Sequence, residues 1–310
     1  MFRTLVAVFL FVIMGAFATE LIPLPRDIKV NKEKVILGKK LFFDPILSKD
    51  GTLSCASCHN LRTNGAGNVQ YTKGIEGKQG AFNVPTVYNA VYNFRQFWDG
   101  RAKDLKDQAF SPIINPIEMG NNTKQVIKDL KNSHYNRLFQ DIYKDGVSKE
   151  NISEVLAEFE KTLRTPNALF DKYLRDDSIV IDEEVIRGYR LFKEKGCISC
   201  HNGINIGGNL YNKFGIYEDA KSKELGRYNL TKEEEDRYVF KVPSLRNVAL
   251  TAPYMHDGRI KTLKEAVNLM AEYQLGRKLN KEDLGNVVAF LKALTGEIPF
   301  AKKNKNDKDE

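Results

Sequence analysis

Apolar residues recur with helical spacing in two segments that closely resemble each other. The segment "VILGKKLF" at residues 35–42 aligns without gaps to "VIRGYRLF" at residues 185–192. In the second segment Val185, Tyr189 and Phe192 share one face, and the first segment shows the same spacing. The pattern predicts two equivalent amphipathic helices.

Both predicted helices carry a glycine at the same position, Gly38 in the first copy and Gly188 in the second. The missing side chain would let another helix approach closely at that point. Each copy also closes with a further apolar stripe at helical spacing. The stripes are Leu156, Phe159 and Leu163 in the first copy and Val287, Phe290 and Leu294 in the second.

A longer repeat lies downstream of each predicted helix. Residues 84–109, "VPTVYNAVYNFRQFWDGRAKDLKDQA", align without gaps with residues 242–267, "VPSLRNVALTAPYMHDGRIKTLKEAV". Strand-like runs such as "TVYNAVYN" are short, and nothing in the pattern indicates a sheet. The sequence therefore predicts an all-α fold with two similar domains that arose by internal duplication.

The chain of 310 residues is long enough for two ordinary domains. The charged stretch "RDDSIVIDEE" offers an Asp cap just before the second copy's first helix. We therefore expect an N-terminal domain at residues 19–176 and a C-terminal domain at residues 177–300. Residues 301–310 have no apolar side chain after Ala301 and are expected to be a charged, solvated tail.

Residues 1–18 have the pattern of a secretory signal peptide. Arg3 precedes an apolar run, and "AFA" at residues 16–18 is a small-residue cleavage site. The run is shorter than a bilayer needs, so a signal is favoured over the alternative of an uncleaved membrane anchor. No later apolar run is long enough to cross a membrane, and we expect an exported, soluble mature chain.

The charge balance argues against a nucleic-acid-binding protein. The formal net charge is +8 and the pI is about 9.1. Basic and acidic residues are interspersed, without a basic stripe that carries interleaved aromatic side chains. A nucleic acid partner is therefore not expected.

All four cysteines belong to two Cys-x-x-Cys-His strings, "CASCH" at residues 55–59 and "CISCH" at residues 197–201. A disulfide within each pair would indicate a thiol oxidoreductase, and the strings could alternatively supply zinc ligands. A histidine directly after both pairs favours haem, because haem c is attached through two thioethers with the histidine on the iron. We expect two covalently bound haem c groups, held by Cys55, Cys58, His59, Cys197, Cys200 and His201.

The group on the opposite face of each iron decides the chemistry. A strong sixth ligand favours electron transfer, whereas a vacant position admits oxygen species. The remaining imidazoles are His134, which lies in a polar helical stretch and is expected on the surface, and His256. The thioether candidates are Met119, Met255 and Met270, although a methionine is by default a core residue.

The order of several motifs resembles the bacterial dihaem cytochrome c peroxidases, which are related to the dihaem MauG enzymes. These motifs are "CASCH", "NVPTVYNAVYNFRQFWDGRA", "DQA", "NPIEMG", "CISCH", "TAPYMHDGRIKTLKEAV" and "LMAEYQLGRKLN". The resemblance implies two cytochrome c-like haem domains that reduce hydrogen peroxide to water with electrons from a small periplasmic cytochrome c or cupredoxin. It also implies a periplasmic location and a homodimer.

The resemblance assigns roles to residues that match its motifs. The first haem is implied to be peroxidatic, and the second, ligated by Met270, to be the higher-potential haem that receives electrons. Glu118 matches the distal acid-base carboxylate, Gln108 its amide neighbour, and Trp98 the aromatic residue between the haems. Without the motifs, Glu118 would be interpreted as an ordinary loop acid and Trp98 as a core residue.

The family also carries a calcium ion between its domains. Asn83 in "FNVPT" matches its side-chain ligand, and Thr251 and Pro253 in "TAPY" match its backbone-carbonyl ligands. Oxygen ligands of this kind suit a hard ion. No acidic cluster in the sequence supports the site independently.

The sequence departs from the family in the glycine-rich stretch "NGAGNVQYTKGIEGKQG". The composition of this stretch fits a plain connector and a loop over the first haem equally well. Many members close the oxidised peroxidatic iron with a histidine from this loop. Here Ile75 takes the expected position and the loop has no histidine. We therefore expect the first haem to be open, or weakly water-bound, when oxidised. Tyr71, Lys73 and Lys78 are the other loop residues that could ligate it.

Two other functions fit a chain with two haems. The MauG branch oxidises residues of a partner protein and uses a tyrosine at the second haem, where this chain has Met270, although Tyr273 is close by. A non-catalytic dihaem electron carrier predicts two six-coordinate irons and negligible peroxide turnover. Met270 argues against the first alternative, and Glu118 and Gln108 argue against the second.

Overall fold

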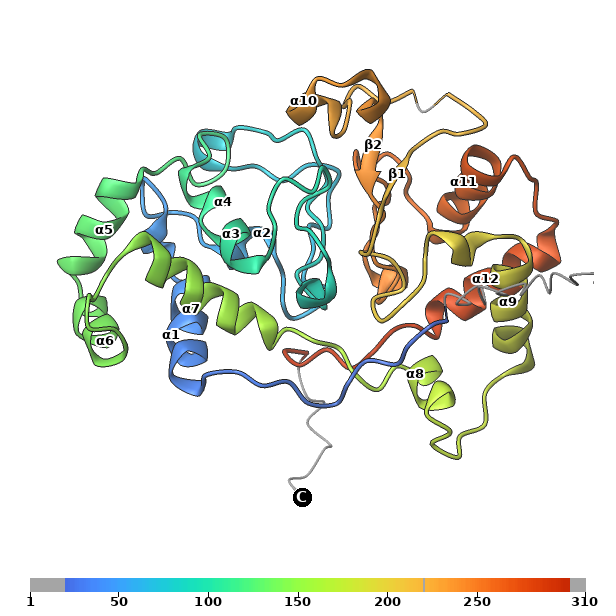
Figure 1. The fold of residues 1–310 in the computed structure, drawn as a ribbon, viewed down its shortest axis with the longest axis horizontal. Coiled ribbons are helices and arrows are strands. Elements are labelled where there is room, and N and C mark those ends of the chain that lie inside the picture. The colour runs from blue at the N-terminus through green and yellow to red at the C-terminus, as the bar shows by residue number, and fades with distance from the viewer. Residues whose placement is uncertain (1–19, 220, 302–310) are drawn as a thin grey trace, which may run out of the picture.

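The computed structural model describes residues 20–219 and 221–301, which form two helix-rich lobes (Figure 1). The predicted signal peptide and the predicted tail after Ala301 lie outside the described residues. The α-helices are α1 (Lys32–Phe43), α2 (Cys55–Cys58), α3 (Leu105–Ala109), α4 (Ser111–Ile114), α5 (Thr123–Lys131), α6 (Tyr135–Ile142), α7 (Lys149–Lys161), α8 (Leu169–Leu174), α9 (Glu183–Glu194), α10 (Tyr228–Thr231), α11 (Leu263–Leu275) and α12 (Lys281–Lys292). Short 3₁₀ turns are η1 (Pro45–Leu47), η2 (Ile75–Gly77), η3 (Ala90–Tyr92), η4 (Cys197–Ser199), η5 (Glu234–Asp236) and η6 (Val248–Leu250), and the strands are β1 (Tyr211–Lys213) and β2 (Val239–Lys241).

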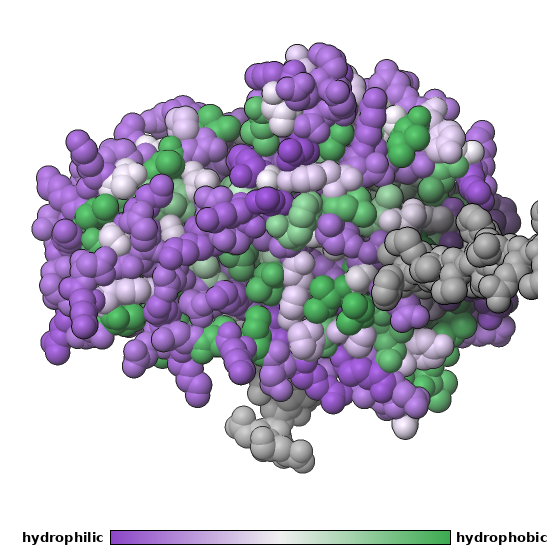
Figure 2. Space-filling model, viewed as in Figure 1, coloured by the Kyte–Doolittle hydropathy of each residue, from purple (hydrophilic) through white to green (hydrophobic). Residues whose placement is uncertain are grey.

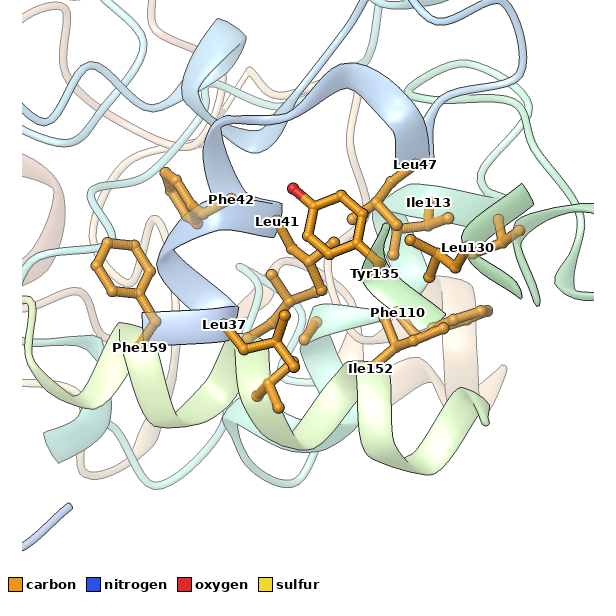
Figure 3. Close-up of a cluster of buried hydrophobic side chains, with 14 of the residues drawn as sticks. Leu37, Leu41, Phe42, Leu47, Phe110, Ile113, Leu130, Tyr135, Ile152 and Phe159 are labelled. Atoms are coloured by element: carbon orange, nitrogen blue, oxygen red, sulfur yellow. The ribbon is translucent and has the colours of Figure 1, made fainter. Parts of the chain in front are cut away.

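The N-terminal lobe is built on the contact between α1 and α7. A Cβ added to Gly38 would lie only 1.8 Å from the Val155 carbonyl oxygen, so the two helices meet at the distance that only glycine permits. Next to this point Phe42 packs edge-on against Phe159, with ring centroids 5.2 Å apart. Figure 3 shows these two rings beside the other buried side chains of this core.

The C-terminal lobe repeats this arrangement with α9 and α12. A Cβ on Gly188 would lie 1.9 Å from the Asn286 carbonyl oxygen, and Phe192 packs on Phe290 with centroids 5.1 Å apart. The close approach expected at both glycines is thus confirmed. Asp182 takes the N-cap position of α9 as predicted, although its side chain forms no capping hydrogen bond. The repeated geometry is compatible with a duplication, which itself stays a prediction.

A small sheet is present in the C-terminal lobe, so the expectation of no sheet was wrong there. Strands β1 and β2 pair antiparallel, with Tyr211 opposite Lys241 and Lys213 opposite Val239. Two strands of three residues are too short to produce a recognisable alternating pattern. The stretch "TVYNAVYN" forms no strand and contains the turn η3.

The chain crosses between the lobes at both ends of the described segment. Leu21 lies in the C-terminal core and forms a bridge with Gly203. Ile298 and Phe300 return to pack against the N-terminal core. Phe170, which precedes the predicted domain boundary, also belongs to the C-terminal core. Figure 1 shows both crossings as blue and red segments between the lobes.

A buried ion pair fixes the first of these crossings. The Arg246 guanidinium donates to both carboxylate oxygens of Asp171 at 2.9 Å, and both side chains are 1% exposed. Arg246 also donates to the carbonyl oxygens of Ile204 at 2.7 Å and Ile22 at 2.8 Å. One side chain therefore connects α8, the N-terminal segment and the loop after the second Cys-x-x-Cys-His string.

The surface is largely polar on the face shown in Figure 2, with hydrophobic side chains scattered between charged ones. Among residues 20–219 and 221–301, no helix has both the length and the apolar character needed to cross a membrane. His134 is exposed, as predicted.

Candidate functional site

The first Cys-x-x-Cys-His string forms one helical turn that ends at the predicted haem ligand. The His59 backbone N–H donates to the Cys55 carbonyl oxygen at 3.0 Å, which places the histidine directly after α2. Its ring nitrogen Nδ1 lies 3.0 Å from the Gly65 carbonyl oxygen and therefore carries the hydrogen. Burial lowers the pKa of His59, so the imidazole is neutral and Nε2 is left to ligate iron.

In the second string the same hydrogen bond places the histidine after the cysteines, and a glycine of the following loop packs closely against the histidine ring. The His201 backbone N–H donates to the Cys197 carbonyl oxygen at 3.1 Å. Burial lowers the pKa of His201 to about 4, and its buried Nδ1 forms no hydrogen bond with the described residues. Gly207 has a φ of +119°, and a Cβ there would lie 3.2 Å from Nδ1 and 2.2 Å from the Pro243 carbonyl oxygen. Only glycine fits at this position, and the histidine ring is held against the loop by packing.

The two alternative interpretations of the cysteines are not supported by the geometry. None of the four cysteines is part of a disulfide. Over residues 20–219 and 221–301, no group of three or more His, Cys, Asp or Glu side chains converges as a metal site. Each string instead presents two thiols beside one neutral imidazole, which is the donor set of haem c.

A cavity of about 350 Å³ opens beside the second string. His201 lines it, and so does Met270 from helix α11, which comes from a distant part of the chain. Most of the remaining wall is apolar, including Phe214, Phe240 and Val287. A neutral imidazole and a thioether in one apolar cavity, next to two thiols, fit a covalently attached haem.

Glu118 lies in the loop after α4, where Asn115 holds it. The Asn115 side-chain amide donates to Glu118 Oε1 at 2.6 Å, and the Glu118 backbone N–H donates to the Asn115 carbonyl oxygen at 3.0 Å. Burial raises the pKa of Glu118, while the Asn115 hydrogen bond and the charge of Arg101 lower it. Oε1 is thus occupied as an acceptor, and Oε2 is the oxygen left to exchange a proton.

The charge of Glu118 is felt at the thiols of the first string, whereas its role as the distal carboxylate stays a prediction. Burial raises the pKa of the Cys58 thiol, and the charge of Glu118 adds to the increase. Burial likewise raises the pKa of Cys55 to about 12, with contributions from Glu160, Cys58 and Glu118. The carboxylate and the first haem-attachment thiols therefore share one region.

The glycine-rich stretch packs on the Glu118 loop and is more than a plain connector. The Ile75 backbone N–H donates to the Glu118 carbonyl oxygen at 2.7 Å, and the Ile75 side chain is 2% exposed. A Cβ on Gly74 would lie 2.0 Å from the Ile117 carbonyl oxygen, and a Cβ on Gly120 would lie 2.9 Å from Ile75 Cγ2. Glycines on both sides of the contact allow the two loops to meet. The residue in the expected histidine position is therefore a buried isoleucine.

Gln108 and Met119 are less directly tied to the site. Gln108 lies on α3 and is half-buried, but the described residues contain no hydrogen bond between its amide and Glu118. Its role therefore stays a prediction. Met119 is 5% exposed and belongs to the N-terminal hydrophobic core, which is the default expected for a methionine.

Trp98 lies at the contact between the lobes. Its indole N–H donates to the Asn83 carbonyl oxygen at 2.8 Å, and its carbonyl oxygen accepts from the Lys241 backbone N–H in β2 at 2.7 Å. Its ring centroid lies 6.3 Å from that of His256 in the second repeat. Trp98 also lines the cavity beside the second string, so a residue of the first repeat reaches the second site.

His256 is a buried packing residue at this contact. Its ring stacks on Phe240 with centroids 4.2 Å apart, and Nε2 lies 2.7 Å from Ser222 Oγ. Burial lowers the pKa of His256 to about 4. Met255 packs in the same aromatic cluster, which is the default expected for a methionine.

The three predicted calcium ligands, Asn83, Thr251 and Pro253, all line the cavity beside the second string, and their role as ligands stays a prediction. The Asn83 amide nitrogen donates to the carbonyl oxygens of Val69 at 3.0 Å and Gln70 at 3.2 Å, which leaves Oδ1 to ligate. One amide oxygen and two carbonyls suit Ca²⁺, which prefers oxygen ligands.

Sequence reasoning missed two residues that lie beside the candidate site, Asn115 at Glu118 and Lys241 on the cavity wall. The sequence does indicate a turn at Asn115, because Asn-Pro favours the start of a turn. In the structure the Asn115 Oδ1 accepts from the Ile117 backbone N–H at 3.1 Å. Lys241 had no such signal, since a lysine in "VFKVPS" suggests a solvated side chain, and only the hairpin buries it.

Comparison with known proteins agrees with this geometry. A family profile described as di-haem cytochrome c peroxidase matches residues 32–179, and one described as cytochrome c matches residues 185–295. The chain is 46% identical to a cytochrome c551 peroxidase of Nitrosomonas europaea, over 87% of this chain and 82% of the relative. It is 44% identical to a cytochrome c551 peroxidase of Pseudomonas aeruginosa, over 89% and 84% of the two chains.

More distant similarity extends to the MauG proteins. The methylamine utilization protein MauG of Methylophilus methylotrophus is 31% identical, over 89% of this chain and 86% of the relative. A solved structure of a MauG-like protein associated with microbial copper homeostasis has a TM-score of 0.77 at 24% identity, covering 91% of this chain and 94% of that one. The shared fold includes both lobes.

Proposed function

The chain belongs to the di-haem cytochrome c peroxidase family, and we propose that it reduces hydrogen peroxide to two waters, consuming two electrons and two protons. The electrons come from a small cytochrome c or cupredoxin. The observation that carries the proposal is the asymmetry between the two string sites. A half-buried carboxyl group, Glu118, lies near the first, whereas a thioether, Met270, lines the cavity of the second.

Both lobes are cytochrome c-type domains, and such domains hold covalently bound haem c. When bound, the two groups supply iron centres that accept single electrons and pass them to peroxide. The residues that hold them are Cys55, Cys58 and His59 in the first lobe and Cys197, Cys200, His201 and Met270 in the second. A methionine–histidine pair raises the reduction potential, which suits the site where electrons arrive.

Glu118 carries the proton in the proposed reaction. Oε2 takes a proton from one peroxide oxygen and returns it to the other, which leaves as water. Asn115 keeps Oε1 in place, so that the free oxygen has a fixed direction. Because burial raises the pKa of Glu118, its protonated form is easier to reach than that of an exposed glutamate. Gln108 would donate from its amide to the bound peroxide.

Trp98 is proposed to lie on the electron route from the second site to the first. Its indole belongs to the first repeat, but it lines the cavity of the second site. Hydrogen bonds on both sides, to Asn83 and from Lys241, hold it at the contact between the lobes. A rigid aromatic side chain in this position shortens the gap between the two haem sites.

The first site is proposed to stay open in the oxidised protein. Ile75 cannot ligate iron, and its backbone is fixed to the Glu118 loop. Lys73 and Lys78 are exposed, and Lys78 Nζ pairs with Glu76 at 2.6 Å. Both loop lysines therefore lie in solvent, and peroxide should react without prior reduction.

The remaining features follow the family. Asn83 Oδ1 and the carbonyl oxygens of Thr251 and Pro253 would bind a calcium ion between the lobes, with waters completing its shell. The predicted signal at residues 1–18 would direct export to the periplasm, where the electron donor is found. A homodimer is proposed on the family resemblance.

Steady-state peroxide reduction with a reduced small cytochrome tests the proposal. Glu118→Gln keeps the shape of the side chain and the hydrogen bond to Asn115 but removes the proton carrier, so kcat/KM should fall by about 10²–10⁴-fold. Glu150→Gln, at an exposed acid in the first turn of α7, serves as the matched control and should retain the wild-type rate. Equal rates in the wild type and Glu118→Gln would remove the acid-base role.

A further inference from the structure

Among the Asp, Glu, Lys, Arg and His residues that are buried as whole residues in the described part of the chain, all but two have a side-chain partner. Lys241 is 7% exposed and Glu160 is 6% exposed, and neither forms an ion pair or a side-chain hydrogen bond with another described residue. The partnered groups are Asp99 with Arg101, Asp171 with Arg246 and His256 with Ser222. An unpaired buried cation costs several kcal/mol, so Lys241 requires an explanation.

Lys241 is part of the wall of the cavity beside the second string. It lies at the end of β2 and lines the same cavity as His201 and Met270. Its neighbours there are mainly apolar or aromatic, such as Phe240 and Val242. Burial in these surroundings lowers the pKa of Lys241 to about 8, which still leaves the ammonium charged at neutral pH. The cavity therefore contains a buried positive charge with no protein anion to balance it.

The other cations around this cavity are differently placed. Lys195 forms an ion pair with Asp283 at 3.3 Å, and Lys213 and Arg277 are exposed. Their charges are compensated or solvated. Among the described residues lining this cavity, Lys241 is thus the cation that needs a bound anion.

Haem c supplies such an anion, because its two carboxylates remain free after the thioether bonds form. We propose that the Lys241 ammonium binds a haem carboxylate in this cavity and that its charge raises the reduction potential of the second haem. A charge-assisted hydrogen bond would compensate both the buried amine and the buried carboxylate. Addition of an electron to the iron is favoured by a nearby positive charge. This role of Lys241 depends on the proposed function in one respect, namely that the second haem is the one that receives electrons.

The same residue is linked to the proposed electron route. The Lys241 backbone N–H donates to the Trp98 carbonyl oxygen at 2.7 Å. Tyr211, opposite Lys241 in the hairpin, donates from its hydroxyl to the Gly100 carbonyl oxygen at 3.1 Å. Lys241 is therefore a positioning residue: its side chain would fix the second haem, and its backbone fixes Trp98 relative to that haem.

A crystal structure of the wild-type haem-loaded protein tests the contact directly. Nζ of Lys241 should lie within about 3.2 Å of a carboxylate oxygen of the second haem. If Nζ is directed at a protein group or at solvent instead, the proposal is wrong. This outcome does not depend on how any variant folds.

Spectroelectrochemical titration of the haem-loaded protein tests the effect on potential. Lys241→Met keeps the length of the side chain and removes the charge, so the reduction equilibrium of the second haem should shift about tenfold toward the oxidised form, which is 59 mV for one electron. Lys213→Met removes the same charge from the exposed end of β1 and should leave the potential nearly unchanged. Lys241→Arg should restore most of the wild-type value.

Retention of the near-infrared band of a methionine-ligated ferric haem would show that Lys241→Met leaves Met270 in place. With that band intact, a potential equal to that of Lys213→Met would overturn the electrostatic role. If the band is absent from the wild type itself, the Met270 assignment in the proposed function fails, whereas the lysine–carboxylate contact is still judged from the crystal structure. The two proposals can therefore fail separately.

Discussion

Replacement of Gly188 by alanine should destabilise the protein, although alanine is the better helix former. A Cβ at this position would lie 1.9 Å from the Asn286 carbonyl oxygen and 2.8 Å from Phe290 Cβ, whereas ordinary contact begins at 3.4 Å. Helices α9 and α12 would have to separate by about 1.5 Å, and a gap of about half that size already forfeits a quarter to a half of the dispersion attraction between packed atoms.

The size of the effect follows from two opposing contributions. Overpacking at a tight contact costs about 1–3 kcal/mol. The helix propensity of alanine returns about 0.5–1 kcal/mol. We therefore expect the free energy of unfolding of Gly188→Ala to fall by about 1–2 kcal/mol. Gly38→Ala, which would place a Cβ 1.8 Å from the Val155 carbonyl oxygen, should behave in the same way.

Gly285 provides a matched control on the partner helix. It lies on α12, and an added Cβ would meet no atom within 4 Å. Gly285→Ala should therefore raise stability by about 0.5–1 kcal/mol. Equilibrium urea unfolding of the haem-loaded protein, followed by far-UV circular dichroism, would compare the variants. If Gly188→Ala is as stable as Gly285→Ala, helix packing does not require glycine at position 188.

Three further outcomes are expected. Arg246→Met leaves Asp171 buried without its partner and should lower the free energy of unfolding by about 3–5 kcal/mol, and a loss below about 1 kcal/mol in urea unfolding would show that the pair does not hold the crossing segments. Burial raises the folded-state pKa of Glu160 to about 8 from an ordinary value near 4.5, so stability is fully present below pH 4.5 and declines as pH rises toward 8. Glu160→Gln should flatten this decline in urea midpoints measured against pH, and an unchanged slope would assign it to other groups. Asn115→Ala removes a hydrogen bond that lowers the pKa of Glu118, so the acidic limb of the kcat/KM profile should move to higher pH; an unmoved limb would mean that another group sets it.

The parts of the fold that follow from local pattern could be predicted from the sequence. The paired helices, the glycines at their contacts and the two haem-attachment strings each depend on a short stretch with defined spacing. The hairpin of β1 and β2 could not be predicted, because its strands are too short to show an alternating pattern. The crossing of Leu21 and Phe300 to opposite cores is likewise set by tertiary packing.

The candidate site, too, could be predicted from the sequence only in part. The proposed donor residues of both haem sites were recognisable because Cys-x-x-Cys-His is a short local motif, and Glu118 was proposed from a family motif. The contacts that tune these residues come from other segments. The Asn115 amide had a turn signal, whereas the burial of Lys241 and the packing of Ile75 on the Glu118 loop depend on how distant loops meet. The charge states in the site therefore required the structure.

Electron paramagnetic resonance of the fully oxidised, haem-loaded protein tests the central claim most directly. The account predicts one low-spin haem with methionine–histidine ligation, at Met270 and His201, and one high-spin haem at His59 whose sixth position is vacant or holds water. Two low-spin haems, with a nitrogen ligand from the loop on the first, would contradict it.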